Sequence, residues 1–222
     1  MDDIIIITYT NLADHITSLE ILLHTTTTNG LKLSKEKSHL LAHKTIFLEN
    51  HISRNTRKID ESHISKLLNR HRPTTPLQLL SFLQSIQFYR EYFRDIHLDI
   101  AQLYKFTTTN KHLKHKKLNL PTSAWKNYDN ILQELKQNSG LHLYIPEYPI
   151  EVHCDASSFD VRAMLCQSVP KHILDSHLNN QHLQAEEILI PLSFFSKSLP
   201  PVVKKRCPTY TELYCILYAI RY

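Results

Sequence analysis

The chain has 222 residues, of which 42% are hydrophobic, and its 26 Lys and Arg residues against 21 Asp and Glu give a net charge of +5. This length can bury a core, and the composition excludes a disordered chain. The four isoleucines at 4–7 are too few for a membrane span or a signal peptide, and acidic residues precede them. We therefore expect an intracellular protein without a membrane partner.

The N-terminal part predicts strands around one helix. Residues 4–8 are β-branched and predict a strand, and leucine and isoleucine then recur at helical spacing as far as Gly30. Residues 31–34 alternate as a strand does. Residues 45–53 and the stretch after them predict a hairpin that turns at 55–56.

Four helices are predicted next. The first must end before Pro73, and Thr75-Pro76 supplies the N-cap and first-turn proline of the second. A third covers about 97–106. The fourth carries Trp125 on its apolar stripe and ends near Gly140.

The last third returns to strands and closes with a helix. Residues 150–158 and 161–168 predict an antiparallel pair, 188–199 predicts a third strand, and the polar stretch 169–187 predicts an insertion or loop. The chain is therefore predicted to be α+β. The final helix begins at about Tyr210, and the residues expected to face a core are Leu213, Leu217 and Ile220.

Positive charge is concentrated in one stretch. No acidic residue lies between Ile100 and Tyr128. Clustered cations of this kind bind phosphate groups, although a solvated linker remains an alternative, for 111–117 in particular. The cations in this stretch are Lys105, Lys111, Lys114, Lys116, Lys117 and Lys126, with His112 and His115 between them.

Glycine and cysteine usage excludes several kinds of site. Gly30 and Gly140 are the only glycines, which rules out the glycine-rich loops of Walker-type and dinucleotide-binding proteins. The cysteines contain no CxxC pair and indicate reduced, buried thiols rather than disulfides or a zinc site. They are Cys154, Cys166, Cys207 and Cys215.

Three acidic positions are candidates for metal chemistry. Asp2 and Asp3 stand directly before a hydrophobic run, Asp155 lies in an alternating strand, and Glu212 lies near the start of the last helix. Such oxygens suit Mg²⁺, and two-metal sites carry out phosphoryl transfer. Each position also has a simpler explanation: solvated terminal acids, an edge-strand carboxylate, and a capping box formed by Thr209 and Glu212.

In this order, the pieces resemble the pol proteins of gypsy-type LTR retrotransposons. The resemblance covers almost the whole chain. MDDIIIIT (1–8) resembles the end of the Y-x-D-D motif of reverse transcriptases, GLKLSKEKSHLL (30–41) the strand after the palm helix, and TIFLENHIS (45–53) the primer-grip hairpin. PTTPLQLLSFLQSIQFYREYFRDI (73–96) is similar to the thumb signature. SAWKNYDNILQELK (123–136), IEVHCDASSFDVRAMLCQ (150–167) and IPLSFFSKSL with CPTYTELYCILYAI (190–220) are similar to the start of a ribonuclease H domain.

The resemblance implies a domain organisation and an activity. It implies the C-terminal part of a polymerase palm over 1–60, thumb and connection helices with a basic linker over 61–120, and the N-terminal part of a ribonuclease H-like domain over 121–222. The implied activity is RNA-directed DNA polymerisation with ribonuclease H cleavage. Both reactions displace at phosphorus with two Mg²⁺ ions, on an RNA/DNA hybrid or a template-primer duplex.

The resemblance also implies residue roles. Asp2 and Asp3 correspond to the paired metal-binding aspartates of the polymerase, and Asp155 and Glu212 to the first two catalytic, metal-binding carboxylates of ribonuclease H. Phe47 and Leu48 would lie near the primer terminus. The residues implied to pass along the nucleic acid are Tyr89, Arg90, Lys105, Lys111, Lys114, Lys116 and Lys117.

The chain also departs from the family. Another polymerase aspartate upstream and further ribonuclease H carboxylates downstream are missing, so we expect an inactive, decaying copy. A retained nucleic-acid-binding module and a truncated gene model are the alternatives. Glycines of the family are replaced at Glu49, Gln84, Asp160 and Arg162, which should strain turns or crowd neighbours.

Overall fold

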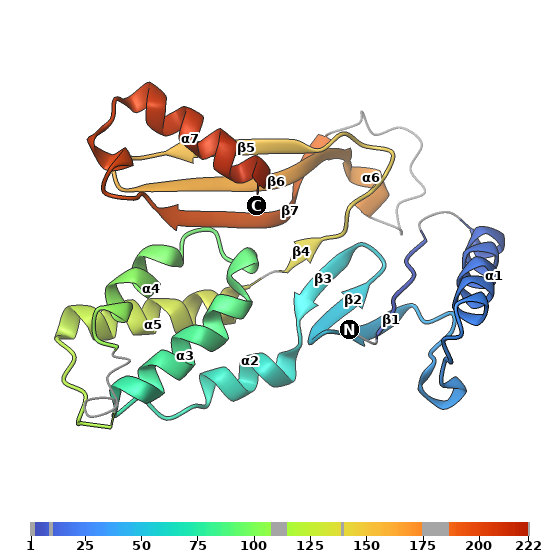
Figure 1. Cartoon of the computed structure of the whole chain (residues 1–222), viewed down its shortest axis with the longest axis horizontal. Helices are drawn as coiled ribbons and strands as arrows, with labels where there is room; N and C mark the ends of the chain where they lie inside the picture. Colours follow the sequence, from blue (N-terminus) through green and yellow to red (C-terminus); the bar gives the residue numbers. More distant parts are fainter. Residues whose placement is uncertain (1–2, 9–10, 108–114, 139, 175–186, 222) are drawn as a thin grey trace.

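The structure is a computed structural model that describes residues 3–8, 11–107, 115–138, 140–174 and 187–221. Two antiparallel sheets and a group of helices make up the chain, which confirms the predicted α+β class (Figure 1). In this view the helices of residues 61–137 lie to the left of the four-stranded sheet and below the three-stranded one, and the C-terminal helix lies on the opposite side of the three-stranded sheet. None of the described helices has the length and apolar character that crossing a membrane requires.

The first sheet is a short meander. Its order is β1-β2-β3-β4, and all neighbours are antiparallel. The predicted hairpin is confirmed as β2 and β3, which turn at residues 54–55, and a second turn at Leu48-Glu49 separates β1 from β2. The strands are β1 (Lys44–Phe47), β2 (Asn50–Ser53), β3 (Thr56–Ile59) and β4 (Leu141–His142).

Two predicted N-terminal strands are wrong. Residues 3–8 and 31–34 carry no regular secondary structure, and Ile4 and Leu31 are exposed. A strand needs a neighbour for its N–H and C=O groups, and in the described sheet β1 pairs only with β2. Between these segments α1 (Leu12–Thr28) begins at an Asn11 N-cap and buries only Thr26, and a short turn of 3₁₀ helix follows at Lys35–Lys37.

The four predicted central helices are confirmed. Thr75 caps the second of them, because its side chain accepts a hydrogen bond from the Gln78 N–H. The fourth helix packs into the same core as the other three. This shared core contains Leu79, Phe82, Leu83, Ile86, Tyr128 and Ile131, each at most 1% exposed. The helices are α2 (Glu61–Leu68), α3 (Pro76–Phe88), α4 (His97–Tyr104) and α5 (Thr122–Gln137), with a 3₁₀ turn at Arg90–Tyr92.

The second sheet contains the three predicted C-terminal strands in the order β5-β6-β7. Of the predicted insertion, 169–170 continue β6, Lys171–Leu174 form α6, and 175–186 lie outside the described residues. The strands are β5 (Glu151–Ala156), β6 (Asp160–Pro170) and β7 (Glu187–Ser198), followed by a 3₁₀ turn at Val203–Lys205 and α7 (Pro208–Arg221).

The predicted core face of α7 is wrong. Leu213, Leu217 and Ile220 are 56%, 59% and 70% exposed, whereas Thr211 and Cys215 are buried. The thiol of Cys215 donates to main-chain oxygens of β5 and β6, which fixes the opposite side of the helix against the sheet. Thr211, Cys215 and Tyr218 recur at the same helical spacing as the exposed set, so periodicity alone does not choose between the two faces.

A buried carboxylate joins the helices to the second sheet. Asp160, at the start of β6, is 2% exposed and accepts hydrogen bonds from Ser157 and from the Arg162 guanidinium. Nε2 of His97, at the start of α4, lies 3.0 Å from Oδ2 of Asp160. Arg162 also contacts Asp95, at 3.0 Å, in the segment before α4. Asp160 and Arg162 therefore form a stabilising junction.

Burial and hydrogen bonding set the protonation states of Asp160 and His97 at this junction. Burial would raise the pKa of Asp160, but the hydrogen bonds from Ser157 and Arg162 outweigh it, and the pKa lies below its usual value. Burial lowers the pKa of His97 below its usual value of 6.5, although Asp160 acts in the opposite direction. His97 is thus neutral at pH 7.

Arg57 makes a second link, between the first sheet, the helices and the second sheet. Its guanidinium donates to both carboxylate oxygens of Glu91, at 3.2 and 2.8 Å, and to the main-chain oxygen of Leu192 on β7, at 2.9 Å. The side chain extends from β3, so one residue connects the first sheet, the 3₁₀ turn after α3 and the second sheet. Two-point bonding of this kind fixes orientation as well as distance.

Strain is found at one of the replaced glycines. Leu48 and Glu49 have φ values of 46° and 63°, the left-handed region that favours glycine. The expected strain at this turn is therefore confirmed. At Asp160 and Arg162 the expectation is wrong, because neither has a positive φ and both are paired. Gln84 lies exposed in α3 and also lacks a positive φ.

The turn between β1 and β2 gives a stability prediction. Leu48→Gly should raise the free energy of unfolding by about 1 kcal/mol, because the relieved left-handed strain exceeds the entropy that glycine adds to the unfolded chain. Ile46→Gly is the matched control: it is exposed on β1 with ordinary strand geometry and should lower stability by about 0.5–1 kcal/mol. Chemical denaturation measures both, and a destabilised Leu48→Gly variant would contradict the strain.

His97 gives a pH prediction. The unfolded chain takes up a proton on His97 near pH 6.5, whereas the folded chain resists it, so this contribution to stability is present above pH 6.5 and is lost as the pH falls below it. His97→Gln should therefore reduce the loss of stability between pH 7 and pH 5. Denaturation series at both pH values measure it. His39→Gln, at an exposed position before β1, should not change that loss, and equal losses in His97→Gln and the parent would contradict a neutral buried His97.

Candidate nucleic-acid interface and carboxylate sites

The one N-terminal aspartate that the structure describes, Asp3, is not held by a strand. Asp2 lies outside the described residues, and Asp3 is exposed in a segment without regular secondary structure. The predicted turn tip before a buried strand is therefore absent at Asp3, since residues 3–8 form no strand. Nothing in the described chain orients this carboxylate toward a shared ion.

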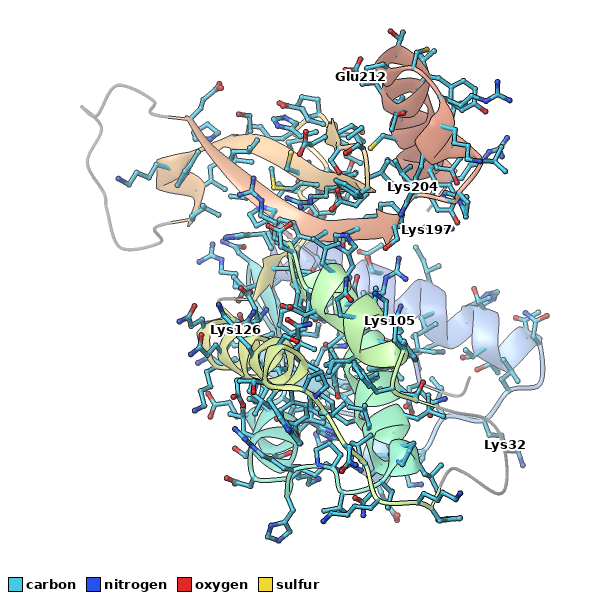
Figure 2. The ribbon with its side chains drawn as sticks, turned by 90° about the vertical axis from the view of Figure 1, so that its left-hand side faces the viewer. Lys32, Lys105, Lys126, Lys197, Lys204 and Glu212 are labelled. Carbon is cyan, nitrogen blue, oxygen red and sulfur yellow. The ribbon has the colours of Figure 1, made fainter. Side chains whose placement is uncertain are left out.

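Asp155 and Glu212 lie on two elements that pack together. Asp155 is exposed on β5, opposite Arg162 on β6. The Cys215 thiol donates to the main-chain oxygen of Asp155, at 3.5 Å, and Glu212 lies one turn earlier on the same helix. Figure 2 shows Glu212 on α7, at the top of the view and above Lys204 and Lys197. The fold thus brings the elements of both residues into contact, while each side chain stays exposed.

The capping-box explanation for Glu212 is wrong. The helix begins at Pro208, a favourable first helical residue, so Thr209 lies within the first turn and not at the N-cap. Thr211 instead bonds the main-chain oxygen of Cys207. Glu212 is therefore not needed as the reciprocal partner of a capping threonine.

A two-magnesium centre does not fit the described residues. Magnesium keeps its waters unless several oxygens replace them, and a two-metal site needs carboxylates close enough to share ions. Within the ranges that the structure describes, the one group of three or more His, Cys, Asp or Glu side chains that could share an ion is Glu151, His153 and Cys166. Neither Asp155 nor Glu212 belongs to such a group.

The predicted primer-grip residues lie at a turn that a hydrogen bond connects to the helices. Phe47 is half-buried at the end of β1, and Leu48 is 45% exposed at the turn. The adjacent Glu49 accepts a hydrogen bond from the Tyr89 hydroxyl, at 2.7 Å. Burial and the Glu49 carboxylate raise the pKa of Tyr89 far above its usual value, so the hydroxyl keeps its proton and its bond. Tyr89, only 3% exposed, therefore connects the helices to this turn.

Arg90 contributes to the contact between the helices and the second sheet. Its guanidinium carbon lies 5.5 Å from the ring centroid of Phe195 on β7. It also lines a cavity of about 130 Å³ between α3, α4 and the end of β7, together with His97 and Ser196. The predicted contact residue is therefore half-buried beside this cavity.

Three lysines line one face of the molecule, and we call Lys105, Lys197 and Lys204 the cationic face. Lys105 and Lys204 are exposed, and Lys197 is half-buried. Figure 2 shows them on the side toward the viewer, Lys105 at the end of α4, and Lys197 and Lys204 at and beyond the end of β7. Lys105 was predicted as a contact residue. Lys116 and Lys117 are also exposed, and Lys111 and Lys114 lie outside the described residues.

Lys197 and Lys204 were not predicted as contact residues. Lys197 donates to the Tyr218 hydroxyl, and its Nζ lies 3.9 Å from that ring's centroid. Nζ of Lys204 lies 5.9 Å from the Phe159 ring, which is 66% exposed. The lysines and arginine of residues 197–206 are a signal that could have been found, but only the fold places them on the same face as Lys105.

Comparisons with known proteins give a likeness in structure alone. No family model matches the chain, and no curated protein matches it in sequence. Among solved structures, the foamy viral protease-reverse transcriptase in complex with RNA/DNA hybrid matches with a TM-score of 0.70 and 19% identity over 95% of this chain. The same protein in complex with double-stranded DNA matches with a TM-score of 0.69, again at 19% identity over 95% of this chain.

This chain is much shorter than those it resembles. It spans 26% of the foamy viral chain solved with RNA/DNA hybrid and 40% of the one solved with double-stranded DNA. A third structure, the dRH form with double-stranded DNA, matches with a TM-score of 0.69 and 19% identity over 95% of this chain and 34% of its own. The chain therefore shares the fold of a part of these reverse transcriptases.

Proposed function

We propose that this chain binds an RNA/DNA hybrid or a template-primer duplex, as part of a retrotransposon reverse transcriptase–ribonuclease H of the gypsy type, and that it does not catalyse phosphoryl transfer by itself. The observation that carries the proposal is the fold, which matches proteins solved with such duplexes over 95% of the chain. The cationic face supports the proposed binding of nucleic acid. The lack of a fitting two-metal site among the described residues supports the proposed lack of catalysis.

The cationic face suits a duplex because it extends over both parts of the molecule. Lys105 belongs to the helices, whereas Lys197 and Lys204 belong to the second sheet and the turn after it. Phosphate contacts position a protein on nucleic acid and need cations along the backbone more than a deep pocket. A duplex lying along this face would contact both parts at once.

The aromatic rings beside Lys197 and Lys204 restrict the positions of the two ammonium groups. Tyr218 accepts a hydrogen bond from Lys197 and lies beneath its ammonium group, while Phe159 lies near Lys204. A lysine held against a ring loses less side-chain entropy when it binds a phosphate. These two cations are therefore better prepared for binding than a solvated linker lysine such as Lys117.

The carboxylates implied for catalysis do not form a shared metal site among the described residues. Asp3 is exposed in an irregular segment, and neither Asp155 nor Glu212 belongs to a group of described side chains that could share an ion. Magnesium would supply charge neutralisation at phosphorus if it were held there. Asp155 and Glu212 are left as two exposed acids on adjacent elements.

A non-catalytic binding module is favoured by a specific observation. Asp160 and Arg162, at positions where the family has glycine, form the junction between α4 and β6. These replacements support the relative position of helices and sheet, on which the continuity of the cationic face depends. They give the fold a stabilising contact that catalysis does not need.

Binding to nucleic acid is tested with the full chain and a fluorescent RNA/DNA hybrid at several salt concentrations. Neutralising the cationic face in Lys105→Gln/Lys197→Gln/Lys204→Gln should weaken binding and reduce the salt slope by about 2–3, because each phosphate contact contributes about 0.9 to it. Fluorescence anisotropy gives both quantities.

A matched triple variant controls for net charge. Lys35→Gln/Lys37→Gln/Lys44→Gln removes the same charge from the exposed segment between α1 and the start of β1, at the far right of Figure 1. It should leave the salt slope within about one unit of the parent value. Equal losses in both triple variants, or no binding by the parent at low salt, would refute a specific cationic face.

Catalysis is tested with primer extension and RNA-strand cleavage in Mg²⁺. We expect the parent to match Asp155→Asn/Glu212→Gln, with no product above that of the variant, because the described carboxylates do not assemble a shared site. Product formed by the parent and lost in the double variant would show that the chain is an enzyme after all.

A further inference from the structure

Three metal-ligating side chains of different chemistry meet on the second sheet, apart from the carboxylates considered for catalysis. Glu151 and His153 are two positions apart on β5, so they project from the same face of the strand. Cys166 on β6 is paired directly with Glu151 in the antiparallel register. The ligand atoms of all three lie within 4.8 Å of one another.

We propose that Glu151, His153 and Cys166 bind a zinc-like divalent ion, which links the edge strand β5 to β6. The ligand set is one carboxylate, one imidazole and one thiol. Thiolate and imidazole select zinc and related ions over magnesium, which prefers oxygen ligands. The proposed ion therefore differs in kind from the magnesium of phosphoryl transfer.

The distances suit a single ion after small side-chain rotations. Ligands of a tetrahedral zinc ion lie about 3.3–3.6 Å from one another, given bonds of about 2.0 Å to nitrogen and 2.3 Å to sulfur. Nε2 of His153 and Oε2 of Glu151 are already 2.9 Å apart. Both side chains are about half exposed, so they are free to rotate toward the thiol.

Burial makes this group more than a surface pair. An exposed Glu–His pair is common and needs no third partner. Here the third member, Cys166, is fully buried, and its sulfur lies 3.6 Å from the main-chain oxygen of Glu151. The protein thus supplies one buried ligand and two half-exposed ones, and three protein ligands leave the fourth position of a tetrahedral ion open to water.

The group is separate from Asp155. That carboxylate is paired across the sheet with Arg162, at the other end of β5, whereas Glu151 begins the strand. In the described sheet β5 is an edge strand, since it pairs only with β6. An ion shared by both strands would hold that edge where the strand begins.

The probe for this site is Co²⁺, titrated into the reduced chain of 222 residues in excess Mg²⁺. Magnesium occupies oxygen-only sites and does not compete for a thiolate. We expect one equivalent of Co²⁺ to produce a sulfur-to-cobalt charge-transfer band in the near ultraviolet, and Zn²⁺ to remove it. The absence of that band would overturn the proposal.

Two variants and two controls assign the ligands. His153→Ala, at a half-exposed position, should fold normally and bind Co²⁺ more than about tenfold more weakly, and Cys166→Ser should abolish the band. Cys207→Ser and His39→Ala, at exposed positions outside the group, should bind as the parent does. Unchanged affinity in His153→Ala, or loss of the band in Cys207→Ser, would overturn the assignment.

Discussion

The position of the helices on the second sheet depends on one buried negative charge. Asp160 is 2% exposed and can stay ionised only because Ser157, Arg162 and His97 surround it. Removing a partner from a buried charge of this kind typically costs about 3–5 kcal/mol. The junction fixes α4 against β6, and Arg57 fixes β3 against β7. Lys105 and Lys197 therefore share a face because the contacts of Asp160 and Arg162 with the α4 region, and the hydrogen bonds of Arg57, hold their elements together.

Local patterns predicted most elements because local chemistry decides them. The Thr75 cap, the Pro73 boundary and the alternation of 150–158 all act within a few residues, and the structure confirms the elements they define. Predictions that depend on contacts with distant residues were wrong. The strand at 4–8 has no neighbour, and α7 presents Cys215 instead of Leu217 to the sheet, although both lie on helical stripes.

Among the candidate site residues, too, those that depend on local sequence were predicted and those that depend on distant contacts were not. Lys105 was predicted from its place in a stretch without acids, whereas Lys197 and Lys204 join it only through the packing of β7 on the helices. All four cysteines were predicted as buried thiols: Cys166 and Cys215 are buried and Cys154 is half-buried, but the prediction is wrong for Cys207, which is exposed. The proximity of Cys166 to Glu151 and His153 was not predicted, because that depends on strand register, which no spacing in the sequence reveals. The strain at Leu48-Glu49 was predictable, since a two-residue turn of this kind favours glycine.

Because α1 buries few side chains, its backbone hydrogen bonds should open more readily than those of the core helices. The helix buries only Thr26, whereas α3 buries Leu79, Phe82, Leu83 and Ile86. Amide hydrogens of α1 can therefore exchange with solvent through local helix–coil opening, without disturbing the rest of the fold. Those of α3 become accessible only when the shared core comes apart. Isotope exchange in α1 would thus report intrinsic helix propensity, while exchange in α3 would report the stability of the whole molecule.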